Sequence, residues 1–508
     1  MRTAILHVTF KVTICFFKDF VAYALSYKNN QNSRGFTMEF LNKAITAISN
    51  VLYQPWCVPL ILLFGGMFLT ARLKGIQVRL FPECFKVLMD KPKEKNGISS
   101  FGALMISTAS RVGTGNIIGV AGAICLGGPG AIFWMWITAI LGGASAFTES
   151  TLAQIFKKRN PDGSSYGGPA FYMQDKLKCR PLGIFFSALI IITYAVGFNM
   201  LASFNVQASF EKFPFYNAKV TPIIIGAALA ILFGICVIGG AKRLAKVTGL
   251  LVPFMGVAYI LVSLIMLIIN FKNIPSMFSL IFSNAFDFSA ILGGFTGSCL
   301  MYGIKRGLYS NEAGMGSAPN AAATADVTHP AKQGLVQMLS VFLDTLLICT
   351  CTAFMCLSSG IDFSLYSGKE AMYVQDALSS AFGAFGTIFI ACALTLFAFT
   401  TLIGNYAYCE GCLKFIFKRP LGKKPMLFFG LAATALVFIG AIASAGVVWG
   451  FAELTQALMV LVNMPVLLYL STYSIRALGD YCRQRKEGKD PVFKAKDIGI
   501  NETLDYWQ

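Results

Sequence analysis

Hydrophobic residues occur in long runs separated by short polar segments, and this alternation extends over most of the chain. A helix that crosses a bilayer needs roughly 20 apolar residues, and somewhat more when it is tilted or broken. Segments of this kind predict an all-α polytopic membrane protein with 11 transmembrane helices. The predicted spans cover residues 51–71, 99–124, 130–156, 182–209, 220–240, 247–270, 288–305, 334–358, 381–416, 425–446 and 449–475.

The second predicted span is interrupted by the glycine-rich sequence Arg111-Val-Gly-Thr-Gly-Asn116. Two glycines one residue apart relax the helix, and unwound backbone at this depth persists only where protein or a water-filled cavity shields it. A broken helix of this kind indicates the binding site of a secondary transporter. The N–H groups of Thr114, Gly115 and Asn116 open the second half-helix, whose positive dipole end favours a carboxylate. The Thr114 side chain is expected to cap that half-helix.

A second glycine cluster, Gly293–Gly303, lies in the seventh predicted span, five spans after the first cluster. Glycine-interrupted helices in corresponding positions of two halves are typical of an inverted five-plus-five repeat, with one extra helix in front. Thr296 and Gly297 are then expected to face the same cavity from the other repeat. The alternative interpretation is that the glycines only allow close helix packing.

Composition and charge support the membrane interpretation. Hydrophobic residues make up 56% of the 508 residues and charged residues only 13%, which excludes a set of soluble domains. The net charge of +18 is divided among alternate loops, including a Lys305/Arg306 cluster assigned to the cytoplasmic side, so it does not indicate nucleic-acid binding. The positive-inside rule places the first span's N-terminus outside and the C-terminus in the cytoplasm of a cell-membrane protein.

The predicted organisation begins with an extension whose natural start is either Met1 or Met38. The expected parts are the extension 1–37, a first helix with a cytoplasmic amphipathic segment at 38–98, repeats at 99–270 and 271–475, and a basic cytoplasmic tail at 476–508.

Several sequence blocks, taken together, resemble the alanine or glycine:cation symporter family. They are Gly113-Thr-Gly-Asn-Ile-Ile-Gly-Val-Ala, Thr148-Glu-Ser-Thr-Leu-Ala, Tyr166-Gly-Gly-Pro-Ala-Phe-Tyr-Met and Arg306-Gly-Leu-Tyr-Ser-Asn-Glu-Ala-Gly-Met-Gly-Ser-Ala-Pro. The resemblance covers residues 50–475. It implies a leucine-transporter-like fold and sodium-coupled import of small neutral amino acids, of the alanine or glycine type, by alternating access.

The fourth span departs from the family pattern. It reads Gly197-Phe-Asn-Met-Leu-Ala-Ser-Phe-Asn-Val-Gln207, without the glutamine that many members carry soon after the Asn-Met pair. A glutamine-preferring transporter is therefore an alternative. Asn199 and Gln207 are candidate substrate contacts, and ordinary hydrogen bonding between helices is the competing explanation.

The resemblance also implies a sodium site. Sodium, like calcium, takes oxygen ligands. The expected ligands are the carbonyls of Ala109, Val112 and Phe397 and the hydroxyls of Thr400 and Thr401. Without the resemblance, a threonine in an apolar helix is expected to bond back to its own preceding carbonyl.

Acidic residues within spans are functional candidates by default. Asp344 and Glu149 make a proton-coupled transporter the first rival, which the dependence of uptake on sodium or on pH would distinguish. Glu149 and Glu410 are alternatively expected to pair with Lys or Arg near cytoplasmic helix ends, and Glu312 to pack an inner gate. Arg111 either pairs with a carboxylate or points into the intracellular vestibule.

An enzyme is not expected. The spans contain no metal-ligand pair, no Ser/His pair and no phosphate-binding loop, and the 14 cysteines show no zinc-type spacing. The expected partners are a small neutral amino acid, co-transported sodium and the lipid bilayer.

Overall fold

The protein is described by a computed structural model that covers residues 35–90, 92, 97–238, 240–286, 298–419 and 421–507. Helices dominate, and the two short strands of the described part pair antiparallel, with Lys158 opposite Tyr166. The first half contains α2 (Gly35–Leu52), α3 (Val58–Arg72), α4 (Ile76–Arg79), α5 (Phe81–Leu88), α6 (Ser100–Arg111), α7 (Ile118–Gly127), α8 (Ala131–Ile155), β1 (Lys158–Arg159), β2 (Ser165–Tyr166), α9 (Pro169–Leu177), α10 (Arg180–Ile191), α11 (Asn199–Ala208), α12 (Thr221–Ile238) and α13 (Gly240–Ile269).

The second half is also mainly helical. It contains α14 (Ile274–Ala285), α16 (Cys299–Asn311), α17 (Pro319–Ala322), α18 (Pro330–Val341), α19 (Thr350–Ser358), α20 (Glu370–Phe382), α21 (Ala384–Phe417), α22 (Lys423–Ile442) and α23 (Ala445–Lys486). Wider π-helical turns at Ile192–Phe198 and Phe342–Cys349 join α10 to α11 and α18 to α19. Such turns occur frequently at functional sites.

Within the described residues, eight helices are long and apolar enough to cross a membrane, and the bent pair α6–α7 makes a ninth. The predicted span 51–71 is shorter in the structure, because α3 begins only at Val58 after a turn that contains Pro55. The predicted span 288–305 lies partly outside the described residues, and the helix described there, α16, extends to Asn311. A multi-pass helical membrane protein is therefore the common conclusion of sequence and structure.

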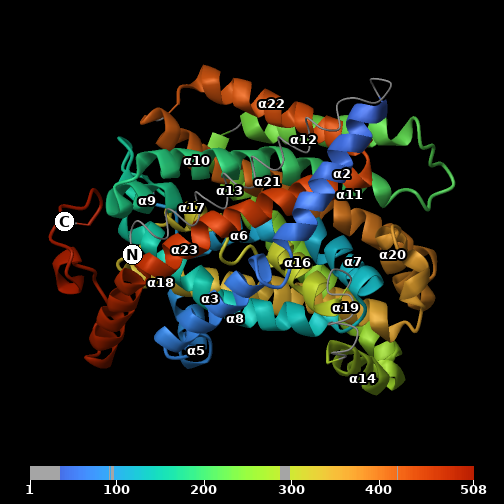
Figure 1. The fold of residues 1–508 in the computed structure, drawn as a ribbon, viewed down its shortest axis with the longest axis horizontal. Helices are drawn as coiled ribbons and strands as arrows, with labels where there is room; N and C mark the ends of the chain where they lie inside the picture. The colour runs from blue at the N-terminus through green and yellow to red at the C-terminus, as the bar shows by residue number, and fades with distance from the viewer. Residues whose placement is uncertain are drawn as a thin grey trace.

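The core forms where α8 packs against α3, α16, α18 and α23, while α12 and α22 pack against each other. Figure 1 shows most of the long helices running roughly parallel, with α14 and α20 at one end of the bundle. The short helices α5 and α9 and the C-terminal tail lie at the other end. The two ends of the bundle therefore carry different loops, as expected for the two sides of a membrane.

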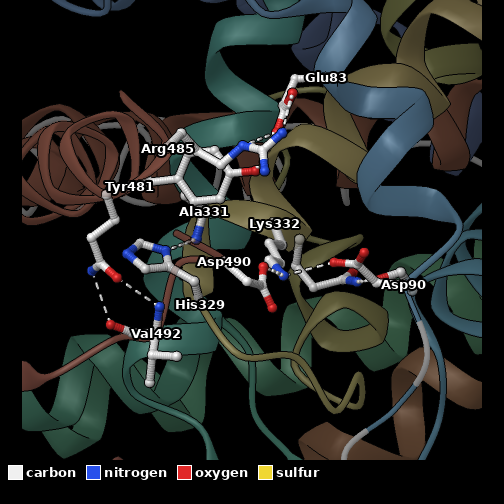
Figure 2. A network of polar contacts seen from close by, with 12 residues as sticks. Glu83, Asp90, His329, Ala331, Lys332, Tyr481, Arg485, Asp490 and Val492 are labelled. Atoms are coloured by element: carbon white, nitrogen blue, oxygen red, sulfur yellow. Dashed lines mark hydrogen bonds and ion pairs between the residues drawn. The ribbon is translucent and has the colours of Figure 1, made fainter. Parts of the chain in front are cut away.

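The C-terminal tail after α23 folds back onto this second end. Lys332, close to the start of α18, bridges Asp90 and Asp490 at 2.7 and 2.8 Å (Figure 2). On α5, Glu83 accepts a hydrogen bond from Tyr481 at 2.8 Å and pairs with Arg485. Burial alone would raise the pKa of Glu83, but the Tyr481 hydrogen bond and the Arg485 charge outweigh it and lower that pKa.

One charge cluster lies elsewhere than predicted. Lys305 and Arg306 are not loop residues, because both belong to α16 and are buried. Their side chains pair with Glu453 of α23 at 3.1 and 3.2 Å. Arg306 also lines a cavity with Lys369, so the prediction that this cluster lies in a loop was wrong.

Candidate functional site

The helix break predicted in the second span is present. Helix α6 ends at Arg111, a single 3₁₀ turn follows at Thr114–Asn116, and α7 begins at Ile118, with a bend of 54° across the break. Asn116 closes the turn, because its Oδ1 accepts the Gly113 N–H at 2.8 Å.

The backbone donors of this turn are not equivalent. The Asn116 N–H donates to the Gly113 carbonyl at 3.2 Å. The N–H groups of Thr114 and Gly115 occupy the first two positions of the turn and have no acceptor within it. They are therefore the donors best suited to an anionic group, while the Asn116 N–H is committed to the turn.

The Thr114 hydroxyl does not cap the second half-helix as predicted. It accepts a hydrogen bond from Asn205 Nδ2 at 2.9 Å and lies 3.5 Å from the Tyr309 hydroxyl. The Asn116 side chain provides the cap because it can reach back to the Gly113 N–H. Thr114 instead links the break to α11 and α16.

A second break follows α16. The left-handed backbone begins at Glu312 (φ 55°) and recurs at Gly314 (φ 85°) and Gly316 (φ 79°). This stretch contacts the first break, because Ser110 Oγ donates to Glu312 Oε1 at 3.2 Å. Glycine is the residue that adopts such dihedrals at little cost, which explains the positions of Gly314 and Gly316.

The break that the sequence predicts within the Gly293–Gly303 cluster is a separate one, and it stays a prediction. Residues 293–297 of that prediction, with Thr296 and Gly297, lie outside the described residues, and Gly303 lies within α16. The Ser-Asn-Glu-Ala-Gly block had been interpreted as packing for a gate. Its alternating polar and glycine residues were the signal that could have identified it as unwound backbone.

The buried charges beside the two breaks have specific partners. Glu149 Oε2 accepts from the Gly316 N–H at 3.1 Å and from Asn463 Nδ2 at 3.0 Å, so it holds the second break. Within the described part of the chain it forms no ion pair with Lys or Arg. Arg111 donates to the Gln337 carbonyl and to Gln337 Oε1, both at 3.4 Å, and forms no salt bridge with a described carboxylate. Glu410 does pair with a basic residue, Lys414, at 2.9 Å.

Asp344 connects the two broken helices. Its carboxylate accepts hydrogen bonds from Asn116 of the first break at 2.7 Å and from Ser310 of α16 at 2.6 Å. Thr345 supplies a third donor at 2.8 Å. The side chain is fully buried in the π-helical turn between α18 and α19, so it is a deep intramembrane carboxylate, as the sequence predicted.

Two backbone carbonyls at the end of α6 lose their helical partners. In an uninterrupted helix, Ala109 and Val112 would accept from Gly113 and Asn116. Those two N–H groups donate instead to the Asn116 side chain and the Gly113 carbonyl. Both carbonyls are thereby released in a buried region, where an unpaired oxygen is costly and a cation would satisfy it.

Helix α21 brings the Thr401 hydroxyl to the same place, while the Thr400 hydroxyl lies 3.6 Å from Met255 Sδ of α13. Thr401 Oγ1 lies against Gly113, where an added Cβ would overlap it. Thr400 and Thr401 donate to the Phe397 carbonyl at 3.0 and 2.9 Å, which is the local bonding expected of threonine in an apolar helix. The five predicted residues thus offer only oxygen atoms, which suits a hard cation such as sodium.

Asn199 and Gln207 are separated by the structure. Asn199 Oδ1 accepts from Asn405 Nδ2 at 3.0 Å, and Asn405 Oδ1 accepts from Ser110 at 2.7 Å, so Asn199 lies beside the α6–α21 contact. Gln207 Oε1 accepts from Tyr216 at 2.9 Å. Among the described residues, Gln207 forms no side-chain hydrogen bond with the break.

A cavity of about 240 Å³ lies beside α7, and we refer to it as the α7 cavity. It is lined by residues of α7, α11, α16, α20 and α23, among them Gly122, Asn205, Arg306, Glu370 and Trp449. The sequence analysis did not identify Asn205, since only the rotational position of α11 distinguishes it from Asn199 and Gln207.

Comparisons with known proteins agree with one another. A model of the sodium:alanine symporter family matches residues 38–495. The amino-acid carrier protein AlsT of Bacillus subtilis is 42% identical over 92% of this chain and 98% of its own length. A Bacillus subtilis protein named "Probable sodium/glutamine symporter GlnT" is 43% identical over 92% of this chain and 97% of its own. The crystal structure of MhsT in complex with L-phenylalanine superposes with a TM-score of 0.54 at 14% identity, over 80% of this chain and 92% of that one.

Proposed function

The chain belongs to the sodium:alanine symporter family, and we propose that the contact between the α6–α7 break and α21 is where it couples sodium to an amino acid. The protein is a sodium-coupled amino-acid symporter. The finer proposal is that it imports small neutral amino acids across the cell membrane by alternating access, with its C-terminus in the cytoplasm. Its fold would be the leucine-transporter type, with one extra helix and an inverted five-plus-five repeat.

The amino-acid carboxylate would bind at the first break. The N–H groups of Thr114 and Gly115 support this, because they lack acceptors within the turn and lie at the positive end of α7. Asn116 would hold the turn in shape through its bond to Gly113. Thr296 and Gly297 remain proposed contacts from the sequence alone, and Asn199 would act through Asn405 and Ser110 rather than by direct contact. Gln207, which accepts a hydrogen bond from Tyr216, would affect substrate binding only from a distance.

The sodium ion would bind beside the same break. Its proposed ligands are the carbonyls of Ala109, Val112 and Phe397 and the hydroxyls of Thr400 and Thr401. The single observation that carries this proposal is the position of Thr401 Oγ1 against Gly113, the residue that follows Val112 at the end of α6. A cation there would tie α21 to the broken helix, so its binding would stabilise the geometry that receives the amino acid.

The test is uptake into proteoliposomes of the purified protein. Labelled alanine, glycine and glutamine are supplied with an inward sodium gradient, and potassium replaces sodium in the matched control. Uptake that requires sodium at every pH supports the proposal. Uptake that is unaffected by the replacement of sodium contradicts it.

A proton-coupled transporter is the second candidate, because Asp344 and Glu149 are fully buried carboxylates beside the breaks. If protons drive transport, an inward pH gradient alone would support uptake in sodium-free buffer. The Asp344→Asn variant would then abolish this pH-driven uptake.

A further inference from the structure

The broken helix α6 is anchored at its beginning by the segment between α17 and α18. The Asp326 N–H donates to the Ile98 carbonyl at 2.9 Å, directly ahead of Ser99, which caps α6. An added Cβ at Gly97 would lie 2.7 Å from Asp326 Cβ, so the two segments are in close contact there. The start of α6 therefore moves away from the rest of the bundle only if its contacts with Asp326 break.

The last described residues of the chain bind the same aspartate. The Tyr506 hydroxyl donates to Asp326 Oδ1 at 2.9 Å. Two cations lie over the Tyr506 ring, with Lys157 Nζ 3.7 Å and the Arg159 guanidinium 5.0 Å from its centroid, and cation–π attraction favours this arrangement. Trp507 is buried beside Tyr506 and donates to a carbonyl at the end of α8 at 2.7 Å. The end of the tail is therefore held by specific contacts.

A second group of contacts holds the tail closer to α23. Lys332 of α18 bridges Asp490 of the tail and Asp90, which precedes α6 in the chain (Figure 2). The Phe493 N–H donates to the Thr328 carbonyl ahead of α18 at 3.0 Å. The tail therefore joins the segment that leads into α6 to the segment that leads into α18, and both groups of contacts would have to loosen before these segments could separate.

Helix α6 and the first break are enclosed by the protein. Every residue from Ala103 to Ile124 is buried. An amino acid held at Thr114 and Gly115 can therefore leave only if an element around the break moves. The tail contacts lie at the end of the bundle where α6 begins, because Asp326 binds both the tail and the start of α6. The proposed function places this end in the cytoplasm, so it is the end that must open for import.

We propose that residues 490–507 form an autoinhibitory clasp that holds the cytoplasmic end of α6 closed, with the bond from Tyr506 to Asp326 as its closing contact. The inference rests on the proposed function, since only the assigned orientation makes this end the exit. The tail stays tethered to α23, so the clasp re-forms readily after each release. Opening is then an equilibrium between a clasped and a released state, and weaker clasp contacts make the released state more populated.

The test is Tyr506→Phe in the full-length protein, which keeps the ring under the two cations and removes only the hydroxyl bonded to Asp326. Hydrogen–deuterium exchange of the α6 amides reports the opening, because exchange requires local separation of packed elements. We expect this exchange to be about fivefold faster, since a hydrogen bond to a charged acceptor is lost. The maximal rate of sodium-driven alanine uptake into proteoliposomes is expected to rise about threefold. Tyr506→Ala/Trp507→Ala is expected to change both quantities further in the same direction.

The matched control is Tyr366→Phe. Tyr366 lies ahead of α20 at the other end of the bundle, and its hydroxyl also donates to an aspartate, Asp376, at 2.9 Å. Its α6 exchange and uptake rate are expected to equal those of the wild-type protein. Unchanged α6 exchange in Tyr506→Phe, faster exchange without faster uptake, or the same increase in Tyr366→Phe overturns the clasp. Absence of sodium-driven uptake for every amino acid in the wild-type protein overturns the proposed function instead, and the exchange comparison then still tests the contact between the tail and α6.

Discussion

Single residues at the first break show how little space separates the elements that meet there. Gly113 lies against Thr401 Oγ1, and Gly115 lies against the Tyr309 ring. Neither glycine is required by a left-handed dihedral, because neither has a positive φ. Both positions exclude a side chain because α21 and α16 approach the backbone, so substitutions there report on tertiary contacts.

Thr401→Val tests the sodium site with a side chain of nearly the same shape. We expect the sodium concentration for half-maximal uptake to rise about tenfold, or ~1.4 kcal/mol, because a buried cation loses one oxygen ligand. Sodium titration of uptake measures this. Thr395→Val is the matched control, since Thr395 lies on the same helix and bonds only its own preceding carbonyl, Ala391, at 2.8 Å. In the Thr400→Ala/Thr401→Ala double variant, the dependence of uptake on sodium concentration is expected to be lost. The same sodium dependence of uptake as in the wild-type protein would disprove the site.

Gly115→Ala tests the first break. An added Cβ would lie 2.7 Å from Tyr309 Cε1, so the ring or the turn must move, and the N–H groups proposed to bind the carboxylate would move with it. We expect the amino-acid affinity to fall about tenfold or more, since displaced donors lose their geometry. Gly119→Ala is the control, because its Cβ would meet the same ring at an ordinary 3.6 Å. Equal affinities in the two variants would remove Gly115 from the site.

At the scale of elements, the two breaks are held by different means. The α6–α7 break is closed by a side chain of its own turn, Asn116. The break after α16 depends on other helices, because Glu149 of α8 accepts the Gly316 N–H and Asn463 of α23 donates to the Gly314 carbonyl. The conformation of the first break is therefore determined by residues close in sequence, and that of the second by contacts with other helices.

Gly316→Ala tests whether contacts from other helices hold the break after α16. The residue has φ 79°, and an added Cβ would lie 2.8 Å from Asn463 Cγ. Gly360→Ala is a matched control, because Gly360 has φ 73° and nothing lies within 4 Å of its added Cβ. The dihedral penalty, about 1–2 kcal/mol, is common to both variants, and the steric overlap is specific to Gly316. Thermal unfolding in detergent is expected to show the larger loss for Gly316→Ala, and equal losses would contradict the packing argument.

At the scale of the whole molecule, the C-terminal tail joins parts of the chain that are far apart in sequence. Trp507 is buried, and its Nε1 donates to the Gln154 carbonyl at the end of α8 at 2.7 Å. Tyr506 donates to Asp326, and the Phe493 N–H donates to the Thr328 carbonyl ahead of α18. The tail had been predicted only as a basic extension, and its apolar and aromatic residues explain why it packs.

Trp507→Ala tests whether the tail stabilises this end of the bundle. We expect a loss of roughly 3 kcal/mol, since a buried indole and its hydrogen bond are both removed. The midpoint of thermal unfolding in detergent measures the loss. Lys489→Ala serves as the control, because Lys489 pairs only with the nearby Glu487 in an exposed position and should change stability by less than about 0.5 kcal/mol. A Trp507→Ala protein as stable as the control would show that the tail does not contribute.

The sequence by itself determined the membrane class, the family and the position of the first break. Each depends on local information: hydropathy over about 20 residues reflects transfer into lipid, and paired glycines weaken a helix wherever they occur. The sequence also identified Asp344 as a deep carboxylate, because a charge in an apolar run is conspicuous.

Only the tertiary structure revealed the left-handed stretch after α16, the face of α11 that meets the first break and the position of Arg306 in a cavity wall. The left-handed stretch after Asn311 is held by contacts from Glu149 and Asn463, and those residues are remote in sequence. Likewise, the rotation of α11 about its axis decides which of its amides faces Thr114, and α11 packs against α21 and α22.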